Sequence, residues 1–186
     1  MRVARLLLIG AAFVLAACSG SATAADCDPI PGVRSGLCPI PVEERVPAPV
    51  EAMPVLGEER ELGLDAFAGR VVVLNFWASW CGPCRVEQPD LNEAYQRLPA
   101  EEVAFLGVNI EDAEANALAH VREFEIPYPS LFDPANDYAS RFAGVGPRNI
   151  PSTLFLDREG RVAVRVSGVI GTRETTSLAA ALADED

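Results

Sequence analysis

The sequence predicts an α/β domain built on a central mixed β-sheet flanked by helices. In the middle of the chain, buried apolar runs alternate with segments of helical spacing, which is typical of strands joined by helices. Further along, two short apolar segments are separated by the turn Asp157-Arg158-Glu159-Gly160, which is typical of an antiparallel hairpin. A sheet with both kinds of connection is mixed.

The predicted elements follow one another closely. Pro89 lies inside the first long helix, where a proline should kink the axis. Thr172 is expected to cap the last helix. In chain order we expect a short strand and turn over 56–70, a buried strand over 71–76, a helix from 85, a buried strand over 103–108, a helix over 111–124, an apolar segment over 128–132, a short helix near 136–142, the hairpin strands 153–156 and 161–166, and a helix from 172.

Residues 1–17 are predicted to be a signal peptide outside the folded domain. An apolar stretch of twelve residues, 6–17, follows two Arg and is too short to span a bilayer as a stable helix. Its end, Leu-Ala-Ala-Cys18, resembles the lipobox of bacterial lipoproteins, in which Cys18 would be lipidated and become the mature N-terminus. The alternative is a plain secretory signal cleaved near 22–25, with Cys18 discarded.

Residues 18–54 are predicted to be a Pro-rich tether, so the folded domain is expected over 55–186. The segment 19–54 contains seven of the 15 prolines and shows little hydrophobic periodicity. Within it, Cys27 and Cys38 bracket a twelve-residue segment, and in an oxidising compartment we expect a local structural disulfide between them. A second redox pair is the alternative.

The charge balance excludes some partners. The net charge is −12, all 15 basic residues are Arg, and removal of residues 1–17 would bring the charge to −14 because it takes away two Arg and no acid. So acidic a chain argues against nucleic acid and against electrostatic attachment to anionic lipid. Membrane attachment would therefore depend on the lipid at Cys18.

The pentapeptide Trp80-Cys81-Gly82-Pro83-Cys84 carries the chemistry. It lies where a buried strand meets the start of a helix, and the unpaired N–H groups there favour a thiolate. A thiol of ordinary pKa, near 8.5, is about 3% ionised at pH 7, whereas one with a pKa of ~7 is about half ionised. A CxxC in this position predicts a redox-active dithiol.

The surrounding residues resemble a known family. The segment 75–85, with Glu87 and Pro89, resembles the TlpA/ResA-like membrane-anchored branch of the thioredoxin superfamily, and Ile150-Pro151-Ser152 resembles its cis-proline loop. The resemblance covers roughly residues 51–186 and implies a thioredoxin-like fold. It implies that Cys81 is the exposed attacking thiolate and Cys84 the buried resolving thiol, which together form the redox-active disulfide.

The resemblance also implies how a substrate would bind. Pro151 would be cis and would hold the Ile150 backbone opposite Cys81, where it can pair with an extended substrate. Trp80 would form part of the contact surface, although ordinary packing is the alternative for this side chain. Gly168 falls where the family usually has a glycine.

One position differs from thioredoxin itself, and another resembles the ResA-like branch. The position six residues before Cys81 is a buried Asp in thioredoxin and is Asn75 here, and an amide cannot exchange a proton. Glu87 lies three residues after Cys84 on the same helical face, and resembles the acidic residue of the ResA-like branch. If burial raises its pKa, Glu87 could accept the proton of Cys84. A solvated glutamate on the helix surface is the alternative.

Other classes of protein fit the sequence poorly. A peroxiredoxin needs Pro-x-x-x-Thr/Ser-x-x-Cys, but Leu74 and Ala78 occupy those positions before Cys81. A copper chaperone of this fold would use CxxxC with a downstream His, whereas His120 is expected on a partly exposed helix flank. A Cys₄ zinc site would need a different spacing. With a single His, a Cys–His hydrolase also fits poorly. No metal or other cofactor is expected.

The predicted function is therefore an extracytoplasmic thiol-disulfide oxidoreductase, lipid-anchored to the bacterial cell membrane. We expect a monomer that reduces disulfides of exported proteins, with apocytochrome c as a substrate suggested by the resemblance, and that is itself reduced by a membrane thiol donor. The Gly-Pro pair between the cysteines is that of thioredoxin, a reductant with a reduction potential of about −270 mV. Two alternatives remain: net oxidation of exported thiols, and a non-catalytic binding module with an inert disulfide.

Overall fold

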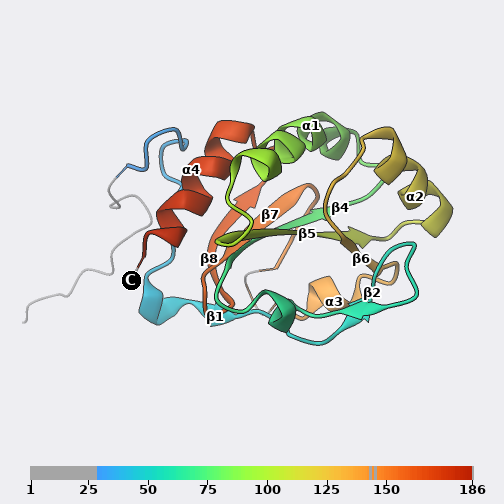
Figure 1. The fold of residues 1–186 in the computed structure, drawn as a ribbon, viewed down its shortest axis with the longest axis horizontal. Helices are drawn as coiled ribbons and strands as arrows, with labels where there is room; N and C mark the ends of the chain where they lie inside the picture. Colours follow the sequence, from blue (N-terminus) through green and yellow to red (C-terminus); the bar gives the residue numbers. More distant parts are fainter. Residues whose placement is uncertain (1–28, 143, 145, 186) are drawn as a thin grey trace, which may run out of the picture.

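A six-stranded mixed sheet forms the centre of the molecule (Figure 1). The computed structural model describes residues 29–142, 144 and 146–185. The strand order is β1-β8-β7-β4-β5-β6; β5 runs parallel to β4 and β6, and the other neighbours are antiparallel. The strands of this sheet are β1 (Val46–Pro47), β4 (Val71–Trp77), β5 (Val103–Ile110), β6 (Ser130–Asp133), β7 (Ser152–Leu156) and β8 (Arg161–Ser167). The predicted mixed sheet and its C-terminal hairpin are confirmed.

Helices cover both faces of the sheet. In Figure 1, α1 (Gly82–Arg97) and α4 (Thr172–Ala183) lie on one face and α3 (Asp137–Ser140) on the other, while α2 (Glu114–Glu123) follows β5. Two short 3₁₀ helices, η1 (Val42–Glu44) and η2 (Leu64–Phe67), and a small sheet of β2 (Met53–Pro54) and β3 (Glu61–Leu62) complete the described residues. Within those residues no helix has both the length and the hydropathy to cross a membrane.

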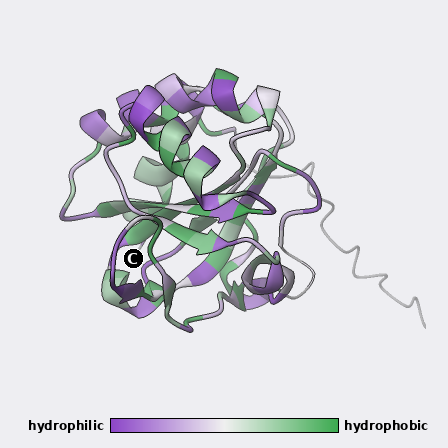
Figure 2. Cartoon of the chain, turned by 90° about the vertical axis from the view of Figure 1, so that its right-hand side faces the viewer, coloured by the Kyte–Doolittle hydropathy of each residue, from purple (hydrophilic) through white to green (hydrophobic). Residues whose placement is uncertain are grey.

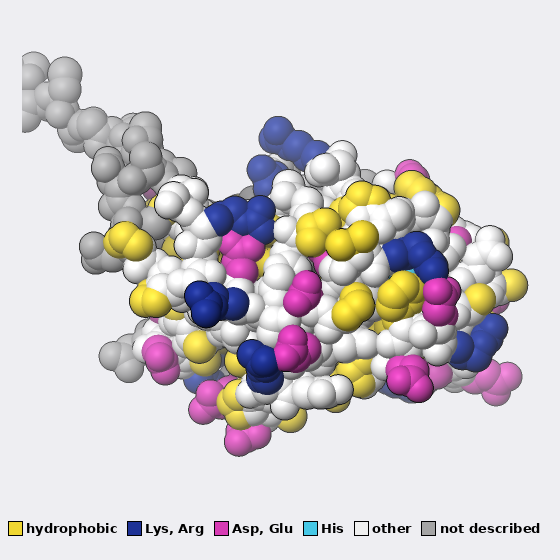
Figure 3. All heavy atoms as spheres, turned by 90° about the horizontal axis from the view of Figure 1, so that it is seen from above, with side chains coloured by type: hydrophobic (Ala, Val, Ile, Leu, Met, Phe, Trp, Pro, Cys, Tyr) yellow, Lys and Arg dark blue, Asp and Glu magenta, His cyan; other side chains and the backbone are white. Residues whose placement is uncertain are grey.

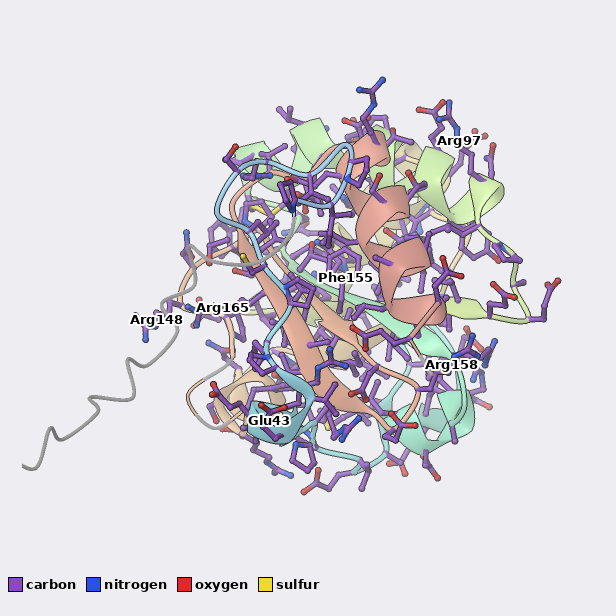
Figure 4. The ribbon with its side chains drawn as sticks, turned by 90° about the vertical axis from the view of Figure 1, so that its left-hand side faces the viewer. Glu43, Arg97, Arg148, Phe155, Arg158 and Arg165 are labelled. Carbon is purple, nitrogen blue, oxygen red and sulfur yellow. A yellow bond between two sulfur atoms is a disulfide. The ribbon has the colours of Figure 1, made fainter. Side chains whose placement is uncertain are left out.

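The central strands explain the unbroken apolar runs in the sequence. Every residue of β4 and β5 is buried, because helices or loops cover both faces of the sheet there. Alternate residues serve different cores: Val71 and Val73 face α1 and α4, whereas Val72 and Leu74 face α3. Phe155 of β7 lies in the interior beside α4 (Figure 4), and Figure 2 shows the hydrophobic residues concentrated between the layers.

The N-terminal boundary of the domain differs from the expected one. The predicted tether over 18–54 includes residues that belong to the folded domain: Ile40 N–H donates to Ala163 O at 2.6 Å, and β1 pairs with β8. Arg45 is buried, with its guanidinium bonded to Asp157 and Glu185. These contacts cover the outer edge of β8, which would otherwise present unpaired backbone groups.

Two helix starts also differ from the prediction. The helix expected from residue 111 begins at Glu114, because Glu111 has a positive φ of 50° and the Asp112 carboxylate accepts from Ala113 N–H at 2.9 Å. Thr172 does not cap α4. Its hydroxyl instead donates to Asp90 Oδ1 of the neighbouring α1 at 2.6 Å, so the predicted cap is wrong.

The predicted signal peptide 1–17, Cys18 and Cys27 lie outside the described residues. Cys38 lies within them and is disulfide-bonded.

Candidate active site

The two cysteines of the CxxC form a disulfide at the start of α1. The S–S distance between Cys81 and Cys84 is 2.02 Å. Cys81 is the N-cap residue of α1, and its sulfur accepts from the backbone N–H of Cys84 at 3.2 Å. Pro83, in the first turn, fits a position that needs no N–H donor. The sulfur of Cys81 therefore lies at the positive end of the helix dipole, where a thiolate is stabilised.

Both cysteines are buried in this oxidised state. Cys84 is 1% exposed, and Cys81, which was expected to be the exposed thiol, is only 4% exposed. An apolar cluster of Leu56, Trp77 and Ala117 surrounds the pair, and Ile150 packs against it. Cys84 is buried as expected, whereas the expected exposure of Cys81 is not seen in this oxidised state.

Glu87 is buried one turn further along α1. Its residue exposure is 1%, so the alternative of a solvated glutamate is wrong. Its Oε1 accepts from Asn75 Nδ2 at 2.8 Å, and its Oε2 accepts from the backbone N–H of Ile170 at 3.1 Å. Burial raises the pKa of Glu87 to about 7, although these two hydrogen bonds favour the carboxylate and oppose the shift. The carboxyl group can therefore gain or lose a proton near neutral pH.

Asn75 orients this carboxyl group. Its amide donates to Glu87 Oε1 and also to Thr153 Oγ1 of β7, at 3.1 Å. The sequence predicted only that Asn75 cannot carry a proton. Its contact with Glu87 depends on β4 lying beneath α1, and no spacing in the sequence indicates this.

The Ile150–Pro151 peptide bond is cis, as expected from the resemblance. Trp80 is 60% exposed, and its indole N–H donates to Glu111 O at 2.9 Å. A groove of about 360 Å³ lies between these two segments. Its lining includes Trp80, Glu111, Asn136, Arg148, Asn149 and Ile150. Arg148 points away from the body of the molecule in Figure 4, so the groove has a charged rim.

Asp112 fixes the loop that precedes the disulfide, and the sequence reasoning missed it. Its carboxylate accepts from Ser79 N–H at 2.6 Å and from the Ser79 hydroxyl at 2.8 Å, as well as from Asn109 and Ala113. Burial would raise the pKa of Asp112, but these hydrogen bonds outweigh it and hold the pKa below its usual value. The ionised carboxylate thus ties the end of β5 to the approach to Cys81.

His120 is not on an exposed flank, and that prediction is wrong. The residue is 2% exposed and its ring stacks on Trp77 at a centroid distance of 4.6 Å. Its Nδ1 lies 3.4 Å from Arg85 Nη1, and burial together with the Arg85 charge lowers its pKa. Within the described part of the chain, no group of three His, Cys, Asp or Glu side chains could hold a metal ion.

The chain is similar to several known proteins. A family model described as the AhpC/TSA family matches residues 46–165. The thiol-disulfide oxidoreductase ResA of Geobacillus thermodenitrificans is 33% identical over 113 residues, which are 61% of this chain and 63% of that protein. The thiol:disulfide interchange protein HelX of Rhodobacter capsulatus is 34% identical over 123 residues, 65% of this chain and 66% of that protein. The chain thus spans a little under two thirds of the length of these curated relatives.

A solved structure is matched over a larger share of its length than these curated relatives are. A secreted thiol-disulfide isomerase from Corynebacterium glutamicum superimposes with a TM-score of 0.73 at 30% identity, covering 78% of this chain and 90% of that one. Together these similarities confirm the thioredoxin-like fold that the sequence resemblance implied.

Proposed function

The chain belongs to the AhpC/TSA family, and from this membership and the site geometry we propose that it is an extracytoplasmic, membrane-anchored thiol-disulfide oxidoreductase. One observation supports this most strongly: a Cys81–Cys84 disulfide at a helix N-terminus has a buried carboxyl group, Glu87, one turn away, with a pKa of about 7. The relatives ResA and HelX are named for the same chemistry. An inert structural disulfide would need no buried proton acceptor beside it.

The reaction begins from the reduced protein. The Cys81 thiolate attacks one sulfur of a substrate disulfide, the substrate S–S bond breaks, and the leaving sulfur takes a proton from solvent. Cys84, as a thiolate, then attacks the Cys81 sulfur. The mixed disulfide breaks, the second substrate sulfur leaves, and the Cys81–Cys84 disulfide forms. Two electrons have passed from the protein to the substrate.

Glu87 makes the second step feasible at neutral pH. Cys84 is buried, so its thiolate is costly to form and its proton needs an acceptor nearby. A carboxyl group with a pKa of about 7 is about half ionised at pH 7 and can act as that acceptor. The Asn75 amide and the Ile170 N–H donate to the two carboxyl oxygens of Glu87, and these hydrogen bonds stabilise its ionised form, which accepts the proton.

We assign the substrate to disulfides of exported proteins. The groove beside Trp80 is lined by Ile150, the residue before Pro151, so an extended peptide bound there would lie against Ile150. Apocytochrome c is the substrate that the ResA-like resemblance suggests, and a membrane thiol donor would return the protein to the reduced state. Net oxidation of exported thiols is the competing direction.

The location follows from Cys18. Lipidation there would anchor the chain to the cell membrane outside the cytoplasm, whereas the acidic net charge gives no attraction to anionic lipid. Mass spectrometry of the protein purified from membranes tests this. We expect an acylated N-terminal peptide that begins at Cys18, and the Cys18→Ala variant should be free of acyl groups. A soluble mature chain that begins near residue 25 would contradict the anchor.

Trapping of covalent intermediates tests the activity. In Cys84→Ser the resolving thiol is absent, so mixed disulfides with substrates should accumulate on Cys81 and be released by a reductant. Cys81→Ser keeps Cys84 but removes the attacking thiol, and is the matched control that should trap few partners. An equal yield from both variants, or none from either, would support the inert-disulfide alternative. The trapped proteins identify the substrate directly.

A further inference from the structure

A segment at the start of the described chain crosses α4 before it joins the sheet. We call residues 29–40 the N-terminal strap; Figures 1 and 4 show it in blue beside α4. Two turns shape it, closed by hydrogen bonds from Val33 N to Ile30 O at 3.1 Å and from Leu37 N to Arg34 O at 3.3 Å. Its apolar side chains pack against the core cluster that contains Leu178 of α4. The strap is therefore docked on the domain.

The strap backbone approaches α4 very closely at Gly32. This residue has a φ of +90°, which favours glycine. A Cβ atom there would lie 2.8 Å from Arg173 Cγ and 2.9 Å from Ser177 Oγ. Only glycine fits without moving these side chains, so the approach of the strap to α4 is specified by the sequence.

Arg34 holds the strap to the start of α4 by several hydrogen bonds. Its backbone N–H donates to Glu174 Oε1 at 3.0 Å and its Nε donates to the same oxygen at 2.7 Å. Its Nη2 donates to Glu174 Oε2 and also to the backbone O of Val169, at 2.9 Å. The bidentate pair with Arg34 lowers the pKa of Glu174 and keeps it ionised. Figure 3, which looks onto this helical face, shows Arg and acidic side chains interspersed there.

Val169 lies between two residues that contact the redox site. On one side, Gly168 N–H donates to Pro151 O at 2.9 Å. On the other side, Ile170 N–H donates to Glu87 Oε2 at 3.1 Å, and Ile170 is fully buried. Three consecutive residues of this loop thus bond to the cis-proline segment, to the strap and to the buried carboxyl group.

We infer that Arg34 is a positioning residue for the redox site: by holding Val169 and Glu174 it fixes the loop 168–171, so that the Ile170 N–H stays aimed at Glu87. Arg34 does not touch the reacting sulfurs. It acts through the loop. This inference rests on the proposed function, in which Glu87 accepts the Cys84 proton.

The charges around Glu87 set the expected direction of the effect. The Ile170 N–H favours the carboxylate, as does Asn75, whereas burial and the negative charge of Asp90 on α1 favour the protonated form. Burial raises the pKa of Tyr128 and the charge of Glu87 helps to raise it, and Cys84 lies one turn away on α1. If the loop loosens, the Ile170 hydrogen bond weakens while the other contacts remain. The carboxylate then loses stabilisation and the pKa of Glu87 rises.

The test measures that pKa directly, by carbon-13 NMR titration of the Glu87 carboxyl group in the oxidised protein. In Arg34→Gln the pKa of Glu87 should rise by about 0.5–1 unit, which corresponds to weakening one hydrogen bond to a charged group. Glu174→Gln breaks the same pair from α4 and should give a shift in the same direction. Arg60→Gln is the matched control, because Arg60 is similarly exposed and pairs with Glu58 away from the redox site.

The inference is overturned if Arg34→Gln and Glu174→Gln shift the pKa of Glu87 no more than Arg60→Gln does. The titration needs no turnover, because it is made on the disulfide form. A protein that fails to reduce any disulfide but shows the predicted pKa shift would thus contradict the proposed function and leave the role of Arg34 standing. A protein that reduces disulfides but shows no such pKa shift would contradict the role of Arg34 and leave the proposed function standing.

Discussion

Glu87 illustrates how one residue can be tuned by opposing effects. Burial disfavours its charge, while the amide of Asn75 and the Ile170 N–H favour it, and burial prevails to give a pKa of about 7. A fully solvated glutamate would stay ionised at neutral pH. It would then be a poor proton donor when Cys84 is reprotonated in the reverse reaction. Burial without these two donors would raise its pKa further. In the proposed mechanism, this balance lets Glu87 accept the proton of Cys84 and return it in the reverse step.

Replacement of Glu87 by Gln should slow the resolving step. The amide cannot accept a proton, so release of a mixed disulfide by Cys84 should fall by about 10²-fold at pH 7, which is the lower range for loss of a general base. The wild-type rate should rise through pH 7 as Glu87 ionises, and that rise should be absent in the variant. Rapid-quench single-turnover kinetics with a model disulfide measures both. Glu101→Gln, on the surface, is the control and should match wild type.

The same residue should make stability depend on pH. The folded pKa of about 7 lies above the ordinary value of 4.5, so between these values the folded state binds more protons than the unfolded state. Stability from this group is fully present below pH 4.5 and is lost as pH rises through 7. The free energy of unfolding of the wild type relative to Glu87→Gln should thus fall by up to about 3 kcal/mol over this range. Urea unfolding of both proteins in the oxidised state, at pH 4.5 and 7.5, tests it; a constant difference would contradict the assignment.

At the scale of elements, the redox site lies where β4, α1 and the end of β5 meet. Asp112 joins them, because it follows β5 and accepts from both the backbone and the hydroxyl of Ser79. Arg85 adds a second link, since its guanidinium bonds to Glu123 of α2 and lies over the ring of Phe124. The disulfide is therefore held by contacts on each side of the helix N-terminus.

Asp112→Ala should loosen this junction. The substitution leaves the Ser79 N–H without its acceptor, so the free energy of unfolding should decrease by about 2 kcal/mol. Hydrogen exchange at Ser79 and Ala113 should also increase. Asp137→Ala is the matched control, because Asp137 is exposed at the start of α3. Equal effects of the two substitutions in urea unfolding would show that Asp112 does not hold the loop.

At the scale of the whole molecule, the residues before β4 form part of the domain. β1 covers the edge of β8, and the buried Arg45 guanidinium bonds to Asp157, whose side chain is 3% exposed. The N-terminal strap then links the same region to α4 and, through Val169, to the redox site. The sheet edge, the C-terminal helix and the site are thus joined by a segment that the sequence assigned to a tether.

A chain limited to residues 55–186 should therefore be much less stable than one of residues 29–186. It loses β1, the N-terminal strap and Arg45, while the buried Asp157 carboxylate keeps the Arg161 guanidinium as a partner. The lost hydrogen bond between Arg45 and Asp157 alone should cost about 1.5–3 kcal/mol, because both groups are charged. Urea unfolding of the two oxidised chains measures the difference. Equal unfolding midpoints would show that the domain does begin near residue 55.

The parts of the fold that could be predicted are those with a local signal. The unbroken run before Trp80 predicted β4, and the turn at Asp157 predicted the hairpin of β7 and β8. β1 was missed because it has two residues, Val46 and Pro47, and no periodicity. The start of the last helix was misread at Thr172, because α4 already includes this residue and has Gly171 at its N-cap position.

The site residues also divide into those with a local signal in the sequence and those brought together only by the packing of the elements. Cys81, Cys84 and Glu87 are close in sequence, so their spacing on one helix predicted their proximity. The contacts of Asn75, Ile170 and Arg34 join residues far apart along the chain, and they exist only because β4, α1 and α4 are packed together. The burial of His120 depends on α2 lying against Trp77, which helical periodicity alone does not indicate.

The reduction potential of the Cys81–Cys84 pair tests the central proposal most directly. It can be measured by equilibrating the protein with thiol-disulfide buffers of known potential and quantifying the free thiols. The proposed reductase should have a value close to the roughly −270 mV of thioredoxin. A value near −120 to −150 mV, in the range of strong disulfide oxidants at about −120 mV, would contradict it and assign the protein to net oxidation of exported thiols.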